Sequence, residues 1–313
     1  MVYSGVFLYI FNAEKVKFCH KSYMIWYSGY TQMSYKPVKS LNLIAGAQIN
    51  KVEGVDANFA PRLGIIYQVT DKLGVKALYG EAFRAPFAVE TSVIVSGFRG
   101  NPDLKPETLT SIDAQVFFRD KGWELSPTYF TNRKEDNITR NVTEAGEIVY
   151  MNANEIKSSG IEFEGKYILN KRWFLTGSYA WQQNEIDFFG TNIEDFSLLP
   201  NHIVKLGVNY QHPRGVSIGL FNTIVSAFGD LTEISGLPQR NEIPEGFSLL
   251  SGKLNMDLNQ LFDLALKQKL ILGVYGTNLL DADVYYPDIT NRLINSFPGR
   301  SGRAVYGSVT VRF

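Results

Sequence analysis

From about residue 22 onward, apolar and polar residues alternate along much of the chain. In one such segment Ile112, Ala114 and Val116 alternate with Asp113 and Gln115. Successive side chains of a β-strand point to opposite faces, whereas the faces of a helix repeat about every 3.6 residues. The pattern therefore predicts strands that each have one apolar face and one polar or ionic face.

The alternation predicts about thirteen strands, with boundaries accurate to a few residues. Many of them exceed the roughly 5–6 residues of an average strand and match the roughly 9–11 residues with which a tilted strand crosses a bilayer. The predicted strands are residues 22–35, 40–50, 59–69, 73–83, 107–119, 122–132, 156–169, 172–185, 201–211, 215–227, 248–263, 267–278 and 302–313.

The connections between these strands alternate strictly between short and long. In an up-and-down antiparallel sheet, this order sends all the short turns to one end of the strands and all the long loops to the other. Outer-membrane β-barrels have this asymmetry, with short periplasmic turns and longer extracellular loops. The short turns are residues 36–39, 70–72, 120–121, 170–171, 212–214 and 264–266, and the long loops are 51–58, 84–106, 133–155, 186–200, 228–247 and 279–301.

Aromatic residues gather near the predicted short turns. Tyr and Trp are enriched where a membrane meets water, so this placement is typical of the aromatic girdle of a barrel. The residues are Tyr67, Phe118, Trp123, Tyr167, Trp173 and Tyr210. Together these features predict an all-β fold, an antiparallel up-and-down transmembrane β-barrel over residues 22–313, with long loops outside the cell and short turns in the periplasm.

The last predicted strand ends the chain on an aromatic residue. Val309, Val311 and Phe313 share one face of it. A terminal aromatic residue on an alternating strand resembles the signal by which the barrel-assembly machinery recognises outer-membrane proteins. We therefore interpret these three residues as a barrel-assembly signal.

Residues 1–21 do not fit the barrel pattern. The stretch Met1–Phe11 is apolar, but no basic residue precedes it and no small-residue cleavage site follows, so a secretory signal is not indicated. We predict an atypical N-terminal segment outside the barrel. Residues 2–11 are only a weak candidate for an additional strand.

Composition excludes several classes of function. The sequence has 31 Lys and Arg against 31 Asp and Glu, a formal net charge of zero, so nothing in the charge favours a nucleic-acid partner. The single cysteine, Cys19, and the scattered histidines predict no metal site. Glu162 and Glu164 share a face, but ionic residues are expected on the lumen side of a barrel. We predict no catalytic residues, no metal site and no cofactor.

Several motifs resemble TonB-dependent outer-membrane receptors, specifically the C-terminal part of their barrel. The most specific are the stretch 79–86, YGEAFRAP, and the stretch 100–108, GNPDLKPET. Weaker matches are residues 61–64, 159–162, 278–281 and 298–300, and the resemblance covers roughly residues 23–313. In the stretch 100–108, Pro102 and Pro106 remove backbone donors, so we predict a rigid return into a strand at Glu107.

The resemblance implies a larger parent protein. Family members carry a plug domain that contacts TonB, followed by a barrel of roughly 22 strands, whereas this sequence offers about 13–14 strands and no room for a plug. We therefore expect an incomplete barrel. Its expected partners are outer-membrane lipid, the barrel-assembly machinery, an external siderophore-like ligand and, only through the missing plug, TonB.

Ligand recognition is expected in the long loops, because loops on a rigid scaffold carry binding. The resemblance implies an iron chelate or a similar bulky nutrient. Arginine could pair with an anionic chelate and aromatic rings could stack on it. The candidate residues are Phe98, Arg99, Tyr285, Tyr286 and Arg292.

Three other classes remain open at this point. A self-standing, 14-stranded passive channel would use residues 2–11 as a strand and would conduct ions steadily. A surface adhesin or structural barrel would show neither conductance nor uptake. An outer-membrane hydrolase would lose its activity when His202 is replaced by Ala. The sequence does not identify the ligand.

Overall fold

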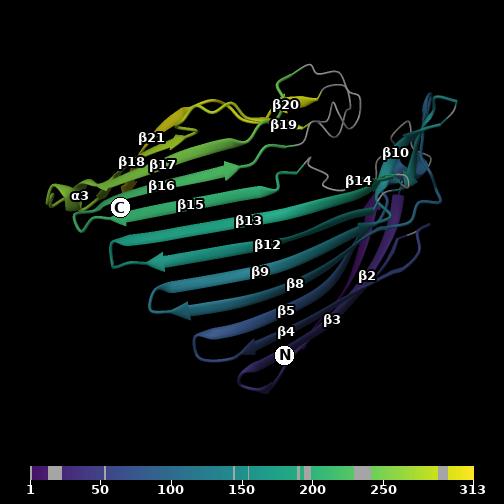
Figure 1. The fold of residues 1–313 in the computed structure, drawn as a ribbon, viewed down its shortest axis with the longest axis horizontal. Coiled ribbons are helices and arrows are strands. Elements are labelled where there is room, and N and C mark those ends of the chain that lie inside the picture. The colour runs from purple at the N-terminus through teal and green to yellow at the C-terminus, as the bar shows by residue number, and fades with distance from the viewer. Residues whose placement is uncertain are drawn as a thin grey trace. The chain divides into compact units, whose positions relative to one another are not determined.

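The computed structural model describes residues 2–12, 23–52, 54–143, 145–153, 155–188, 191–193, 199–228, 241–287 and 295–313. These residues are almost entirely strands, joined by turns and two short helices (Figure 1). Within these ranges, no helix has the length and apolar character needed to span a membrane.

The chain forms two compact units, and several strands contribute to both. Unit 1 comprises residues 1–116, 129–159 and 184–195, and unit 2 comprises residues 117–128, 160–183 and 196–313. The strands of the main sheet are β1 (Val2–Asn12), β2 (Tyr23–Val38), β3 (Leu41–Val52), β4 (Asn58–Gln68), β5 (Leu73–Arg84), β8 (Glu107–Asp120), β9 (Trp123–Glu135), β12 (Glu155–Ile168), β13 (Trp173–Phe188), β15 (His202–Gln211), β16 (Val216–Val225), β17 (Phe247–Asp257), β18 (Lys269–Thr277) and β21 (Ala304–Arg312).

These strands pair in the order of the sequence, from β1 at one end to β21 at the other. The strand β14 (Thr191–Ile193) pairs with β13 off this path. Neighbouring strands along the path run antiparallel, as in the pairs of β1 with β2, β4 with β5, β15 with β16 and β18 with β21. The prediction of an incomplete up-and-down barrel sheet of about 13–14 strands is therefore confirmed.

The register in unit 1 aligns the apolar side chains of neighbouring strands on one face. Leu43 pairs with Tyr35 on β2 and with Ile65 on β4, and Ile65 pairs with Ala77 on β5. The opposite face is polar and hydrogen-bonded, as in the 2.8 Å bond from the Ser34 hydroxyl to the Asn42 side-chain oxygen. A slip of one residue would exchange the two faces, so these contacts fix the register.

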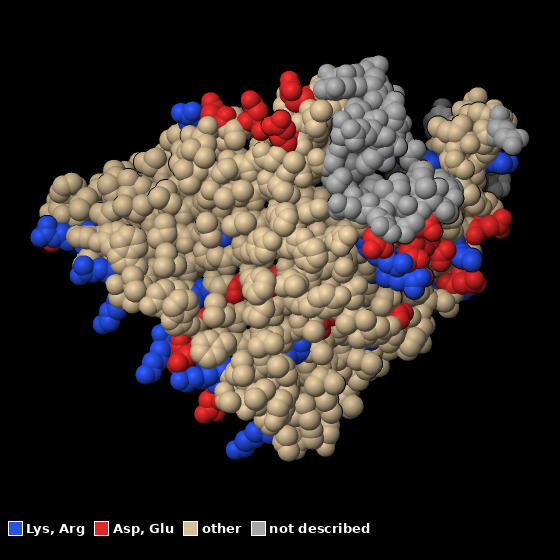
Figure 2. All heavy atoms as spheres, in the orientation of Figure 1, with Lys and Arg blue, Asp and Glu red and all other residues tan. Residues whose placement is uncertain are grey.

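Unit 2 repeats this arrangement. Leu175 on β13 pairs with Val208 on β15, which pairs with Leu220 on β16. At the other end, Leu272 on β18 pairs with Val309 on β21. Figure 2 shows the result as broad uncharged surface over the middle of the strands, with charged residues gathered near the strand ends.

Three elements differ from the sequence-based expectation. Residues 2–12, which the sequence analysis placed outside the barrel, form β1 and pair with β2 from Val2 opposite Met33 to Asn12 opposite Tyr23. The predicted strand 248–263 ends at Asp257, which caps α3 (Leu258–Leu261) by accepting a hydrogen bond from the Gln260 amide at 3.3 Å. The alternation of apolar and polar residues continues through Leu258, so the sequence pattern did not reveal that the strand ends at a helix cap.

The third difference lies in the long loops, which form small sheets of their own. In unit 1, β10 (Ile138–Val142), β11 (Ile148–Asn152), β7 (Phe98–Arg99) and β6 (Ile94–Val95) form a sheet in that order. The helix α1 (Ala88–Ser92) precedes it in the chain. In unit 2, β19 (Tyr285–Pro287) pairs with β20 (Ser296–Pro298). These strands are too short to leave a period in the sequence.

Candidate functional site

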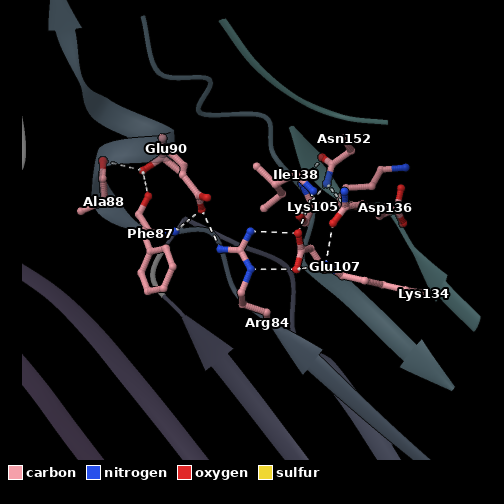
Figure 3. A network of polar contacts seen from close by, with 12 residues as sticks. Arg84, Phe87, Ala88, Glu90, Lys105, Glu107, Lys134, Asp136, Ile138 and Asn152 are labelled. Atoms are coloured by element: carbon pink, nitrogen blue, oxygen red, sulfur yellow. Dashed lines mark hydrogen bonds and ion pairs between the residues drawn. The ribbon is translucent and has the colours of Figure 1, made fainter. Parts of the chain in front are cut away.

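A densely connected polar group of unit 1 lies where β5 ends and β8 begins. Arg84, the last residue of β5, forms a bidentate ion pair with Glu107, the first residue of β8, with Nε–Oε2 and Nη2–Oε1 distances of 2.7 and 2.9 Å. The Arg84 Nη1 atom also lies 2.9 Å from Oε2 of Glu90 on α1 (Figure 3). Bidentate pairing fixes orientation as well as distance, so this arginine sets the path of the loop 84–106.

Glu107 also holds the next loop. Its carboxylate lies 3.1 Å from Nζ of Lys134 on β9 and accepts a 2.8 Å hydrogen bond from the amide of Ile138, the first residue of β10. The residue is only 5% exposed. One buried carboxylate thus joins β5, β8, β9 and β10 at the loop ends of the strands.

Glu107 lies at the end of a 14-residue strand, longer than the roughly 9–11 residues needed to cross a bilayer, and we place it outside the membrane-spanning segment. Burial opposes its charged form, but the Arg84 guanidinium, the Ile138 amide and the Lys134 ammonium together hold the pKa of the carboxyl below its usual value. The carboxylate is therefore charged throughout the neutral range.

The loop after Arg84 is fixed by Glu90. Its carboxylate accepts a 2.7 Å hydrogen bond from the Phe87 amide and so closes the first turn of α1. The Arg84 guanidinium carbon lies 5.1 Å from the centre of the Phe87 ring. These contacts turn the chain back over the strand end.

The stretch 100–108 ties two loops together. Asn101 donates to the Tyr150 carbonyl at 3.1 Å, and Asn152 both accepts from the Lys105 amide and donates to its carbonyl, at 2.8 and 2.9 Å. Leu104 is buried against Tyr150. β8 begins at Glu107, so the predicted return into a strand at that residue is confirmed.

The small sheet of unit 1 presents two arginines. The Arg140 guanidinium carbon lies 5.5 Å from the centre of the Phe98 ring and 5.6 Å from that of Tyr150, and the two rings pack edge to face at 5.3 Å. Arg99 is exposed and lies 3.6 Å from Glu147. Exposed guanidinium groups beside aromatic rings can bind a planar or aromatic anion.

The structure therefore gives Phe98 and Arg99 different environments. Phe98 packs against the buried cluster of Val93, Leu104 and Tyr150, whereas Arg99 projects into solvent. Arg140 was not among the residues predicted from the sequence, because it lies 42 residues after Phe98 in the chain. Only the pairing of β10, β11 and β7 brings it to Phe98.

The candidates of unit 2 lie on β19. Tyr286 packs edge to face against Phe228 and Phe247, with ring centres 5.9 and 6.1 Å away, and also contacts Phe297. Tyr285 is half-buried. The packing leaves Tyr286 less free to stack on a ligand than the sequence suggested, and Arg292 lies outside the described residues.

The remaining chemistry candidates have local partners. The Nδ1 atom of His202 lies 2.9 Å from the hydroxyl oxygen of Tyr179. Across the described ranges, no group of three His, Cys, Asp or Glu side chains is placed to hold a metal ion. Val309 and Val311 lie on the apolar face of β21 opposite Leu272 and Leu270, and their role as an assembly signal stays a prediction.

A family model described as "TonB dependent receptor-like, beta-barrel" matches residues 20–236. The iron-regulated outer membrane virulence protein of Vibrio cholerae is 25% identical over 211 residues, which is 61% of this chain and 32% of the relative. The heme/hemopexin utilization protein C of Haemophilus influenzae is 28% identical over 141 residues, 36% of this chain and 20% of the relative.

Solved structures share the fold. The siderophore receptor PirA from Acinetobacter baumannii superposes with a TM-score of 0.70 at 17% identity, covering 92% of this chain and 45% of that one. A mutant of the ferric enterobactin receptor PfeA from Pseudomonas aeruginosa gives a TM-score of 0.71 at 15% identity, with the same coverage. The chain thus spans less than half the length of these relatives.

Proposed function

The chain belongs to the TonB-dependent receptor β-barrel family, and we propose that it forms part of an outer-membrane receptor that takes up an anionic iron chelate, such as a siderophore complex or haem. Members of the family are transport receptors of the outer membrane for iron, siderophores or haem. Most names of the relatives support iron as the cargo and differ in its carrier, whereas one solved neighbour is the copper transporter OprC. The passive-channel alternative has no such support from them.

One observation supports an anionic and aromatic ligand in particular. Arg99 and Arg140 are both exposed on the small sheet of unit 1, and Arg140 lies over the Phe98 and Tyr150 rings. A catecholate or porphyrin ligand offers both negative charge and a flat ring system, which such a surface can bind by charge-assisted hydrogen bonds and stacking. The network of Arg84 and Glu107 holds this sheet in place.

The other parts of the proposal follow from the family. The long loops face the outside of the cell and the short turns face the periplasm. The chain matches slightly less than half the length of the solved receptors. The rest of the barrel, and a plug that couples to TonB, are supplied by the part of the protein that corresponds to the other half. From the last long loop we retain Tyr285, which is half-buried on β19, and Arg292 as ligand contacts, whereas Tyr286 packs against neighbouring rings.

The proposal is tested by ligand binding to the outer-membrane protein that carries this sequence, in its native length. Ferric enterobactin and haem serve as probes, and intrinsic fluorescence quenching gives Kd. The double variant Arg99→Ala/Arg140→Ala is expected to weaken binding of one probe at least tenfold, since each charged hydrogen bond contributes about 1.5–3 kcal/mol.

Arg119→Ala is the matched control. This exposed arginine lies at a short turn of unit 2 and pairs with Glu124 at 3.3 Å, so its loss should leave Kd unchanged. Equal affinities of the double variant and the unmodified protein for both probes would refute the assignment of the site. Steady ion conductance from the purified protein would favour the passive channel instead.

A further inference from the structure

The apolar face of unit 2 carries a groove of about 540 Å³ that begins beside the short turns at Trp123 and Tyr167 and extends to Leu250. The groove follows two neighbouring rows of residues that are paired across adjacent strands. Leu175, Val208 and Leu220 form one row, and Gly177 and Leu206 begin the next. Glycine at 177 opens the groove, because no side chain fills that position. The lining extends from β9 to β17.

The dimensions of the groove suit one acyl chain. Six strands, from β9 to β17, line it, and at about 4.8 Å per strand the groove is about 24 Å long. Strands cross a bilayer at about 45°, so a groove running across them is also inclined at about 45° and covers about 17 Å of depth. One leaflet of a hydrocarbon core about 30 Å thick is about 15 Å deep.

Aromatic pairs mark the end of the groove beside the turns. Trp123 and Tyr167 stack with ring centres 3.9 Å apart, and both line the groove. Trp173 and Tyr210 lie 4.6 Å apart in the neighbouring pair of strands. Such rings occupy the depth of the glycerol and carbonyl groups of a lipid.

Cations follow directly beyond these rings. Lys121, Lys171, Arg172 and Arg214 lie in three successive short turns of unit 2, and all four are exposed. Turns that are two strands apart are separated by about 10 Å. Figure 2 shows Lys and Arg gathered at the edge of the molecule where the short turns of Figure 1 lie.

We infer that this surface binds an anionic phospholipid of the turn-side leaflet, with an acyl chain in the groove and its phosphate on the cations of the turns. Three features coincide in unit 2, namely the groove, the aromatic rings at its turn end and an excess of positive charge in the turns, where Asp120 is outnumbered by the four cations. Ordinary solvating lipid would require only the apolar face. The inference does not depend on which ligand the receptor transports.

Quenching by brominated lipids tests the inference directly. The protein is placed in vesicles of phosphatidylcholine that contain increasing amounts of acyl-brominated phosphatidylglycerol or acyl-brominated phosphatidylcholine. Replacing Trp26 and Trp181 by Phe leaves Trp123 and Trp173 as the only tryptophans of this sequence, so their emission reports on the groove. Brominated phosphatidylglycerol is expected to quench at a several-fold lower mole fraction than brominated phosphatidylcholine.

Two variants separate the parts of the site. Lys171→Gln/Arg172→Gln/Arg214→Gln should reduce the preference for phosphatidylglycerol at least tenfold, since each cation near an anionic surface contributes about fivefold. Gly177→Leu should remove the preference by filling the groove. Its new Cβ would meet Leu206 Cδ2 at 3.6 Å, an ordinary contact, so the strand should fold unchanged.

Lys36→Gln/Lys39→Gln is the matched control, because it removes the same kind of charge from the end of β2 and the turn after it in unit 1, and neither β2 nor β3 lines the groove. It should keep the full preference. Equal quenching of the unmodified protein by the two lipids would overturn the inference. A loss in the control equal to that in the triple variant, or a full preference in Gly177→Leu, would overturn it as well. Ligand binding can succeed or fail independently of this assay.

Discussion

Removal of the Glu107 carboxylate should release the loop sheet of unit 1. In Glu107→Ala, Arg84 keeps only Glu90 among its ion-pair partners described above, and the Ile138 amide loses its acceptor. Breaking a fully buried ion pair costs about 3–5 kcal/mol. The Glu107 side chain is 6% exposed but that of Arg84 is 34% exposed, so water can compensate part of the loss. We expect about 3 kcal/mol.

The assay is native-state hydrogen exchange followed by mass spectrometry on peptides that contain Ile138. A loss of about 3 kcal/mol corresponds to a protection factor lower by about a hundredfold. Glu155→Ala is the matched control, because its partner Arg133 is half exposed and the pair lies on the surface. Surface pairs contribute about 0–1 kcal/mol, so protection should change less than about tenfold.

The acid dependence gives an independent check. The folded pKa of Glu107 is lowered, so its contribution is fully present above the unfolded pKa of about 4.3 and is lost as the pH falls through the folded value. The difference in protection between the unmodified protein and Glu107→Gln should therefore disappear in strong acid. Equal effects of Glu107→Ala and Glu155→Ala, or a difference that persists at low pH, would refute this reasoning.

Three further predictions concern the fold and its orientation. In urea unfolding, Gly215→Ala should destabilise unit 2 by more than about 1 kcal/mol. The backbone angle φ at Gly215 is +79°, and the new Cβ would lie 2.8 Å from the Cβ of Asp257. Gly307→Ala should have little effect, because no heavy atom lies within 4 Å of its new Cβ. On intact cells, a membrane-impermeant maleimide should label Ser96→Cys but not Lys171→Cys in a Cys19→Ser background, and the reverse pattern would contradict the proposed orientation. An antibody to residues 84–106 should recognise an outer-membrane protein much heavier than 35.3 kDa, because the chain covers only 45% of the solved receptor PirA, and a species of 35.3 kDa would contradict the larger parent.

Much of the sheet could be predicted because the two-residue repeat of a strand appears within the strand's own sequence. The alternation of Ile112 and Ala114 with Asp113 and Gln115 depends only on which side of the backbone each side chain lies. The order of short turns and long loops then determined the up-and-down path. The two prolines before Glu107 likewise located the start of β8 from local backbone chemistry.

The site was decided by contacts between distant parts of the chain. Arg84 and Glu107 belong to two motifs that the sequence analysis quoted, but neither motif states that the two side chains form a pair. Arg140 reaches Phe98 only because β7 and β10 both pair with β11. Short loop strands have no period, and their partners are chosen by tertiary packing, so the sequence pointed to the loops as binding elements and only the structure determined which of their side chains meet.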